Sequence, residues 1–156
     1  MPDKIDTKAT TSGLLTATGA ETVYDTTVAI SYSINGKAYS KAAVTDGATP
    51  TTQGDGSALT QLTASKGCFL VWCLNAAGTV SIFQGDIQTL DVQNEFVKAP
   101  NFPYIDYSTY CPFAYQELKA ANTAGTITIG SSNWNATGFT NTIQNVHTLP
   151  ARPLEL

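Results

Sequence analysis

The stretch that decides the fold is GCFLVWCLNAAGTVSIF, residues 67–83. Its apolar run, Cys68–Leu74, is short and bounded by turn residues, which is typical of a strand buried on both faces of a sheet. Asn75–Gly78 fits a type I turn with the glycine in the left-handed conformation, and Thr79–Phe83 supplies the returning strand. The stretch therefore predicts a β-hairpin with a fully buried first strand.

A second hairpin is predicted upstream of this run. Thr26–Ile34 alternates apolar and small side chains with the period of two that indicates a half-buried strand. Asn35 and Gly36 follow at once, and both tolerate the positive φ that a type I′ turn requires. We expect the returning strand at Lys37–Thr45.

The downstream half predicts further strands and one long connection. Residues 84–110 contain two prolines and are expected to form a crossover, with at most a helical turn at Asp91–Val97. Strands are predicted at Phe113–Lys119, at Thr126–Gly130 and within Phe139–Val146. The sequence therefore predicts an all-β fold: a β-sandwich or small β-barrel of about seven short strands built from hairpins.

The two ends differ from the middle of the chain. Residues 1–20 are polar and show no sustained period, which predicts an extended arm or flexible lead-in. Residues 21–148 are predicted to form a single β domain. Residues 149–156, LPARPLEL, carry two prolines, so we expect an extended C-terminal tail, either docked or free.

The composition is unusually poor in charge. Only 13% of the residues are charged, about half of the ~25% usual in soluble domains, while 24 of the 156 are threonine. A surface of hydroxyls and amides is easily desolvated, which favours lasting contact with other subunits. The alternative is a secreted or surface β-domain that uses Thr and Ser for solubility.

The charge distribution also limits the partners. The net charge is −4 and the eight basic residues are scattered, which argues against nucleic acid. No apolar stretch is long enough to span a membrane. The start, MPDKIDTKATTSG, lacks the apolar core of a signal peptide, so we expect synthesis in the host cytoplasm. Free, buried thiols are therefore expected at Cys68, Cys73 and Cys111.

The sequence offers little for catalysis, metal or cofactor binding. His147 is the single histidine, and no nucleophile elbow, zinc spacing, phosphate loop or dinucleotide motif occurs. Asp86, Asp91, Glu95 and Asp106 could serve a glycosidase, but solvated loop residues are the simpler interpretation. We therefore predict no enzyme activity, no catalytic residues, no metal and no cofactor.

Aromatic residues provide the candidate contact sites. Residues 120–151 contain no charged side chain but include Trp134 and Phe139, a pattern that a subunit interface tolerates; a central strand with an uncharged polar face is the alternative. Tyr104, Tyr107 and Tyr110 recur every three residues. One interpretation is an aromatic strip on the surface that binds carbohydrate or a protein partner. The other is a cluster that fills the core beneath a long loop.

The second half of the chain resembles small virion proteins of tailed bacteriophages. The resemblance covers about residues 67–153. It consists of a shared order of secondary-structure elements and a few short recurring sequence segments. These are FLVW and NAAGTV (residues 69–72 and 75–80), APNFP (99–103), CPFAY (111–115), GSSNW (130–134) and TLPARP (148–153).

The resemblance implies a structural protein with no catalytic residues to carry over. The leading hypothesis is a capsid decoration (cement) protein, a homotrimer that binds the major capsid protein lattice on the virion surface and stabilises contacts between coat subunits. Residues 1–19 or 149–156 could then add a strand to a neighbour's sheet. The alternative is a tail or fibre component with a host-surface or glycan-binding role.

Overall fold

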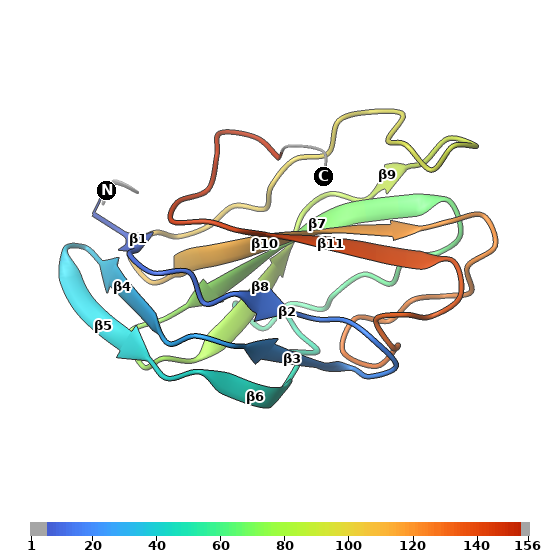
Figure 1. Ribbon diagram of the computed structural model, residues 1–156. Coiled ribbons are helices and arrows are strands. Elements are labelled where there is room, and N and C mark those ends of the chain that lie inside the picture. The colour runs from blue at the N-terminus through green and yellow to red at the C-terminus, as the bar shows by residue number, and fades with distance from the viewer. Residues whose placement is uncertain (1–5, 154–156) are drawn as a thin grey trace.

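The computed structural model describes residues 6–153, and every regular element in that part of the chain is a β-strand (Figure 1). The strands are β1 (Lys8–Ala9), β2 (Leu15–Thr16), β3 (Val23–Thr26), β4 (Ile30–Ile34), β5 (Lys37–Lys41), β6 (Val44–Ala48), β7 (Lys66–Leu74), β8 (Val80–Gln84), β9 (Gln88–Thr89), β10 (Cys111–Ala120) and β11 (Phe139–Asn145). The prediction of an all-β fold is therefore confirmed.

The strands form three antiparallel sheets. The main sheet has the order β11-β10-β7-β8, with β9 paired to one end of β7. Two smaller sheets, β1-β4-β5 and β2-β3-β6, lie together below it in Figure 1. The described sheets are open at their edges, so the molecule is a sandwich and not a closed barrel.

Strand β7 has core residues on both faces of the main sheet. Cys68, Leu70, Trp72 and Leu74 point to the inner face, where they pack against the two small sheets. Phe69, Val71 and Cys73 point to the outer face, which is covered by the crossover (residues 85–110) and by Leu149 of the tail. The continuous apolar run is thus explained, because neither face of β7 meets water.

The two hairpins predicted from the sequence are confirmed. β4 pairs with β5, and the turn between them has φ of 51° at Asn35 and 76° at Gly36. β7 pairs with β8 through a turn in which Gly78 has φ of 77°. Asn75 stabilises that turn, since its Oδ1 accepts hydrogen bonds from the Ala77 and Thr79 N–H groups.

The predicted bounds of the upstream strands were wrong. Thr26–Ile34 is two strands, β3 and β4, which belong to different small sheets. Thr27–Ala29 connects them, and the Val28 N–H donates to the carbonyl of Gly13. The predicted return strand Lys37–Thr45 is also divided, because the chain leaves β5 after Lys41 and enters the other small sheet as β6.

The N-terminal segment is extended, but the described part is not a free arm. β1 pairs with β4 and β2 pairs with β3, and Ala9, Leu15 and Ala17 are buried in the inner core. The segment also reaches the far end of the chain. The Ala9 N–H donates to the His147 carbonyl, and the Leu15 N–H donates to Oδ1 of Asn145. Residues 1–5 lie outside the described residues.

Of the remaining predictions, some are confirmed and others are wrong. The last strand is confirmed as β11, which pairs along β10. Thr126–Gly130 is not a strand, because only an isolated bridge joins Ile127 to Leu62. Asp91–Val97 contains no helix; it forms a turn closed by a bridge between Leu90 and Phe96. Leu149 is buried, so the described part of the tail is docked, while residues 154–156 lie outside the described residues.

Candidate functional site

The three predicted tyrosines of the crossover have different surroundings. Tyr107 and Tyr110 are half-buried against the outer core cluster. The Tyr110 ring meets Phe83 edge-on at 4.9 Å, and its hydroxyl donates to the Gly54 carbonyl at 3.0 Å. Tyr104, in contrast, is 78% exposed. The Tyr107 and Tyr110 rings therefore pack on the outer face of the main sheet, and the Tyr104 ring is exposed to solvent.

Tyr104 stands between two grooves. The first, the Tyr104 groove, has a volume of about 480 Å³ and lies between the crossover, the end of β8 and the loop after β6. Its lining is Gln53, Asp55, Ser57, Phe83, Gln84, Pro103, Tyr104, Asp106 and Tyr110. The second, of about 420 Å³, lies between residues 101–107 and tail residues 149–153.

Polar contacts fix the loop that forms one wall of the Tyr104 groove. The Gln84 N–H donates to Oε1 of Gln53, and the Gly54 N–H donates to the Ile82 carbonyl. Gly54 is required for this approach, since a Cβ at this position would lie 2.4 Å from the Phe83 ring. The loop is therefore held against the edge of β8, and the groove has fixed walls.

The two carboxylates of the groove are held by neighbouring hydroxyl and N–H groups. Ser57 donates to Asp55 from both its hydroxyl and its N–H. Ser108 donates to Asp106 in the same way, and the Thr109 hydroxyl adds a bond. These hydrogen bonds hold the pKa of each carboxyl below its usual value, and the bond from the serine hydroxyl has the largest effect. Both groups are suited to accept hydrogen bonds and poorly suited to act as general acids.

Trp134 and Phe139, the other two predicted interface residues, are buried. Their rings stack at 6.4 Å within the inner core, and the Trp134 indole N–H donates to the Val23 carbonyl at 2.8 Å. Their side chains therefore contribute to this chain's own core and offer no free surface to a partner in this conformation. The charge-free segment that contains them still supplies one exposed element, β11.

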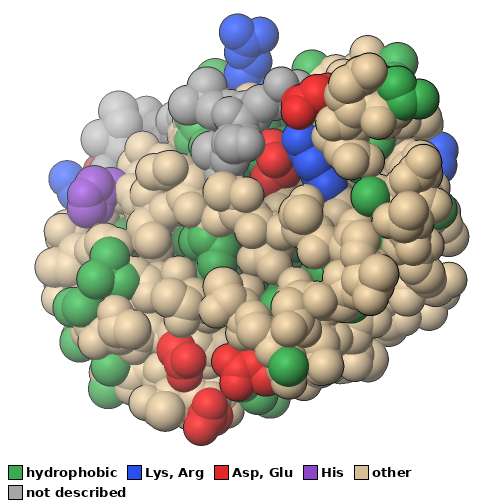
Figure 2. All heavy atoms as spheres, turned by 45° about the vertical axis from the view of Figure 1, so that its right-hand side comes forward, with side chains coloured by type: hydrophobic (Ala, Val, Ile, Leu, Met, Phe, Trp, Pro, Cys, Tyr) green, Lys and Arg blue, Asp and Glu red, His purple; other side chains and the backbone are tan. Residues whose placement is uncertain are grey.

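β11 is an edge strand of the main sheet and carries no charge. On the outer face Thr140, Thr142 and Gln144 are exposed beside β10. Among residues 6–153, no other strand pairs with the free side of β11. Figure 2 shows that uncharged atoms cover most of the face displayed there, with charged side chains in a few separate groups.

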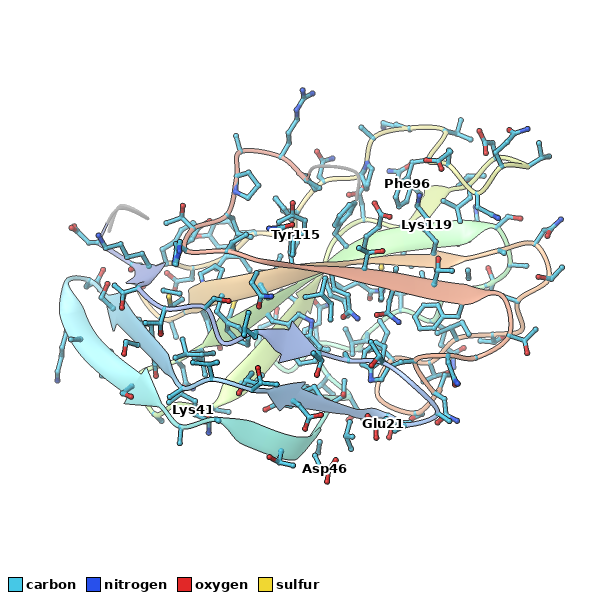
Figure 3. All side chains as sticks on the ribbon, viewed as in Figure 1. Glu21, Lys41, Asp46, Phe96, Tyr115 and Lys119 are labelled. Carbon is cyan, nitrogen blue, oxygen red and sulfur yellow. The ribbon has the colours of Figure 1, made fainter. Side chains whose placement is uncertain are left out.

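One buried ion pair lies on the outer face of β10. Lys119 Nζ is 3.5 Å from the carboxylates of both Glu117 and Glu95, and it sits 5.2 Å from the centre of the Phe96 ring. Lys119 and Phe96 lie together above the main sheet in Figure 3. The group fastens the turn at residues 91–97 to the sheet.

The other acidic candidates serve separate turns. Asp91 accepts N–H bonds from Gln93 and Glu95, which closes the turn at residues 91–97. Asp86 accepts hydrogen bonds from Gln88 and from the Asn101 N–H. Burial raises the pKa of Asp86, but these bonds outweigh it and the net effect is a lowered pKa. The structure pairs Asp106 with Asp55 in a groove, a proximity that the sequence alone did not indicate.

The three cysteines are free and buried, as predicted. Burial raises the pKa of the Cys68 and Cys111 thiols to about 12, which leaves both groups protonated and unreactive. The His147 ring forms a hydrogen bond with the Ala9 carbonyl through Nδ1, at 2.6 Å. Within residues 6–153, no cluster of three or more His, Cys, Asp or Glu residues could hold a metal ion.

Comparison with known proteins gives no identification. No family model, no curated protein and no solved structure matches the chain. In the described residues there is no helix able to cross a membrane. The resemblance to phage virion proteins therefore remains a prediction from the sequence.

Proposed function

We propose that this protein is a non-enzymatic subunit of a larger assembly, and specifically a decoration protein on the outer face of a tailed-phage head. The proposal is supported by a charge-poor exterior, visible in Figure 2, that costs little to desolvate. The expected partner is the coat lattice, and the expected form of the free protein is a homotrimer.

The observation that carries the proposal is the open, neutral edge of β11. Natural sheets protect their edges with charged residues, prolines, bulges or covering segments. In this chain β5 has lysines at both ends, β6 contains Asp46, and the loop at Gln53 and Gly54 binds the edge of β8. β11 carries no charged residue and no proline along its seven residues, although the Leu15 N–H binds the Asn145 side chain at its end. Such an edge is suited to accept a strand from a neighbouring subunit.

The described part of the N-terminal arm is already paired within this chain. Deleting residues 1–19 would remove Ala9 and Leu15 from the inner core. We therefore expect such a deletion to destabilise the fold. β11 replaces the arm as the proposed contact with a coat subunit.

Purified particles test the proposal. Particles are isolated on a density gradient from lysed cells that carry the gene, and the chain is quantified on a stained gel beside the coat protein. A decoration protein should be present in proportion to the coat protein. Presence in few copies per particle would indicate the alternative, a tail or fibre component, and absence from particles would overturn both.

A charged edge tests the role of β11. Gln144 is exposed, neutral and opposite Tyr115 on β10, so Gln144→Lys adds an edge charge with little effect on the fold. Thr27→Lys, in an exposed connection, is the matched control. Gln144→Lys should reduce binding to particles stripped of the protein, while Thr27→Lys should bind normally. Equal binding of both variants would remove β11 from the proposal.

A further inference from the structure

The Tyr104 groove has the composition of a ligand site. Its volume of about 480 Å³ lies within the ~300–1,000 Å³ typical of ligand pockets. Its floor is aromatic, formed by Phe83 and Tyr110, and its rim presents the exposed Tyr104 ring. The Tyr104 ring is 78% exposed, so it is free to stack on a ligand that enters the groove.

The hydrogen-bonding groups of the groove are mainly acceptors. Hydrogen bonds from Ser57 and Ser108 lower the pKa of Asp55 and Asp106 respectively, which favours the ionised form that accepts hydrogen bonds. The amides of Gln53 and Gln84 are already bonded within the chain, to Ala58 and to Thr60 respectively. Among residues 6–153, no Lys, Arg or His lines the groove. A suitable ligand therefore brings many hydroxyl donors and no negative charge.

We propose that the Tyr104 groove binds a neutral oligosaccharide, with the Tyr104 ring stacked on the apolar face of one sugar. Asp55 and Asp106 accept hydrogen bonds from sugar hydroxyls on either side of the ring. Since both carboxyls have a lowered pKa, neither supplies the proton that glycoside cleavage needs, so the groove holds the sugar without cutting it. Anionic sugars and phosphates are repelled by the same two groups.

This site is independent of the assembly contact at β11. The groove is built by the crossover and by the loop after β6, whereas β11 lies at the opposite edge of the main sheet from β8. Loss of one function leaves the other in place. A glycan site on a particle-bound protein would attach the particle to a carbohydrate surface.

A glycan array tests the inference with the full chain. The array carries neutral hexose and N-acetylhexosamine oligosaccharides beside sialylated and sulfated ones, together with a lysine-rich peptide. The wild-type chain should bind a subset of the neutral glycans, and titration calorimetry with the best of these gives the affinity. Binding only to acidic glycans, only to the basic peptide, or to nothing on the array would overturn the inference.

Two variants locate the binding. Tyr104→Ala should weaken the affinity roughly five- to tenfold, the loss expected for one stacked ring. Val92→Ala, which truncates another strongly exposed apolar side chain, should leave it unchanged. Gln144→Lys should also bind the glycan normally, even if it fails to bind particles. An affinity that Tyr104→Ala does not reduce would place the sugar elsewhere and refute the site.

Discussion

The ion pair on β10 allows a test in which one lysine faces two carboxylates at the same distance. Lys119 Nζ is 3.5 Å from Glu117, whose side chain is 4% exposed, and 3.5 Å from Glu95, whose side chain is 59% exposed. The Coulomb attraction at 3.5 Å is about 5 kcal/mol at an effective dielectric of 20, and about 1 kcal/mol in water before screening by salt. The Lys119–Glu117 and Lys119–Glu95 pairs therefore have the same distance and differ in burial.

Lys119→Met removes the ammonium and keeps most of the aliphatic stem. The variant leaves the buried Glu117 carboxylate without this partner, and we expect it to lower the free energy of unfolding by about 3 kcal/mol. Glu95→Gln removes only the exposed partner and should cost under about 0.5 kcal/mol.

Urea unfolding at pH 7, followed by tryptophan fluorescence, measures both changes from the shift in midpoint. Glu117→Leu in the Lys119→Met background should recover much of the loss, because an apolar pair then replaces a buried carboxylate that has lost its ammonium partner. Equal costs for Lys119→Met and Glu95→Gln would refute the reasoning, since they would show that burial does not set the strength of this pair.

Three further substitutions follow from burial and backbone conformation. Leu15→Ala should cost about 3 kcal/mol in urea unfolding and the exposed Leu14→Ala under about 0.5, because only Leu15 lies in the core. Gly138→Ala should cost about 2 kcal/mol in the same assay, since φ is 75° and a Cβ would lie 2.8 Å from a backbone nitrogen, while Gly125→Ala has free space and should be neutral or slightly stabilising. Burial raises the pKa of Cys68 to about 12, above the value of roughly 8.5 in the unfolded chain. The protonated thiol therefore contributes its full stability below about pH 8.5, and this contribution is lost as the pH rises toward 12. In Cys68→Ala the urea unfolding midpoint should accordingly fall less between these two pH values.

Local patterns predicted the elements whose partners are adjacent in sequence. The turns at Asn35-Gly36 and at Gly78 were found because their residue types match the φ values required. The buried run at β7 was found because both of its faces are apolar. For the two turns the determining interaction lies within a few residues of the pattern, and for β7 the apolar run itself records that both faces are covered.

The errors arise where a distant segment decides the outcome. The alternation over Thr26–Ile34 is uninterrupted, yet the chain moves between sheets at residues 27–29, where Gly13 supplies a partner. β1 and β2 contain two residues each, too few to show any period. The spacing of the three tyrosines gives no indication that Tyr104 alone is exposed, because the docking of the crossover on the sheet determines that.

The contacts that join Ala9 to His147 and Leu15 to Asn145 have a consequence for biosynthesis. The ribosome makes the N-terminal partner of each pair long before its C-terminal partner, with sequence separations of 138 and 130 residues. The sandwich therefore cannot close until residues 145–147 have left the ribosome. Until then the core side chains of β1 and β2 remain without their C-terminal partners, and their apolar surface stays exposed to other chains.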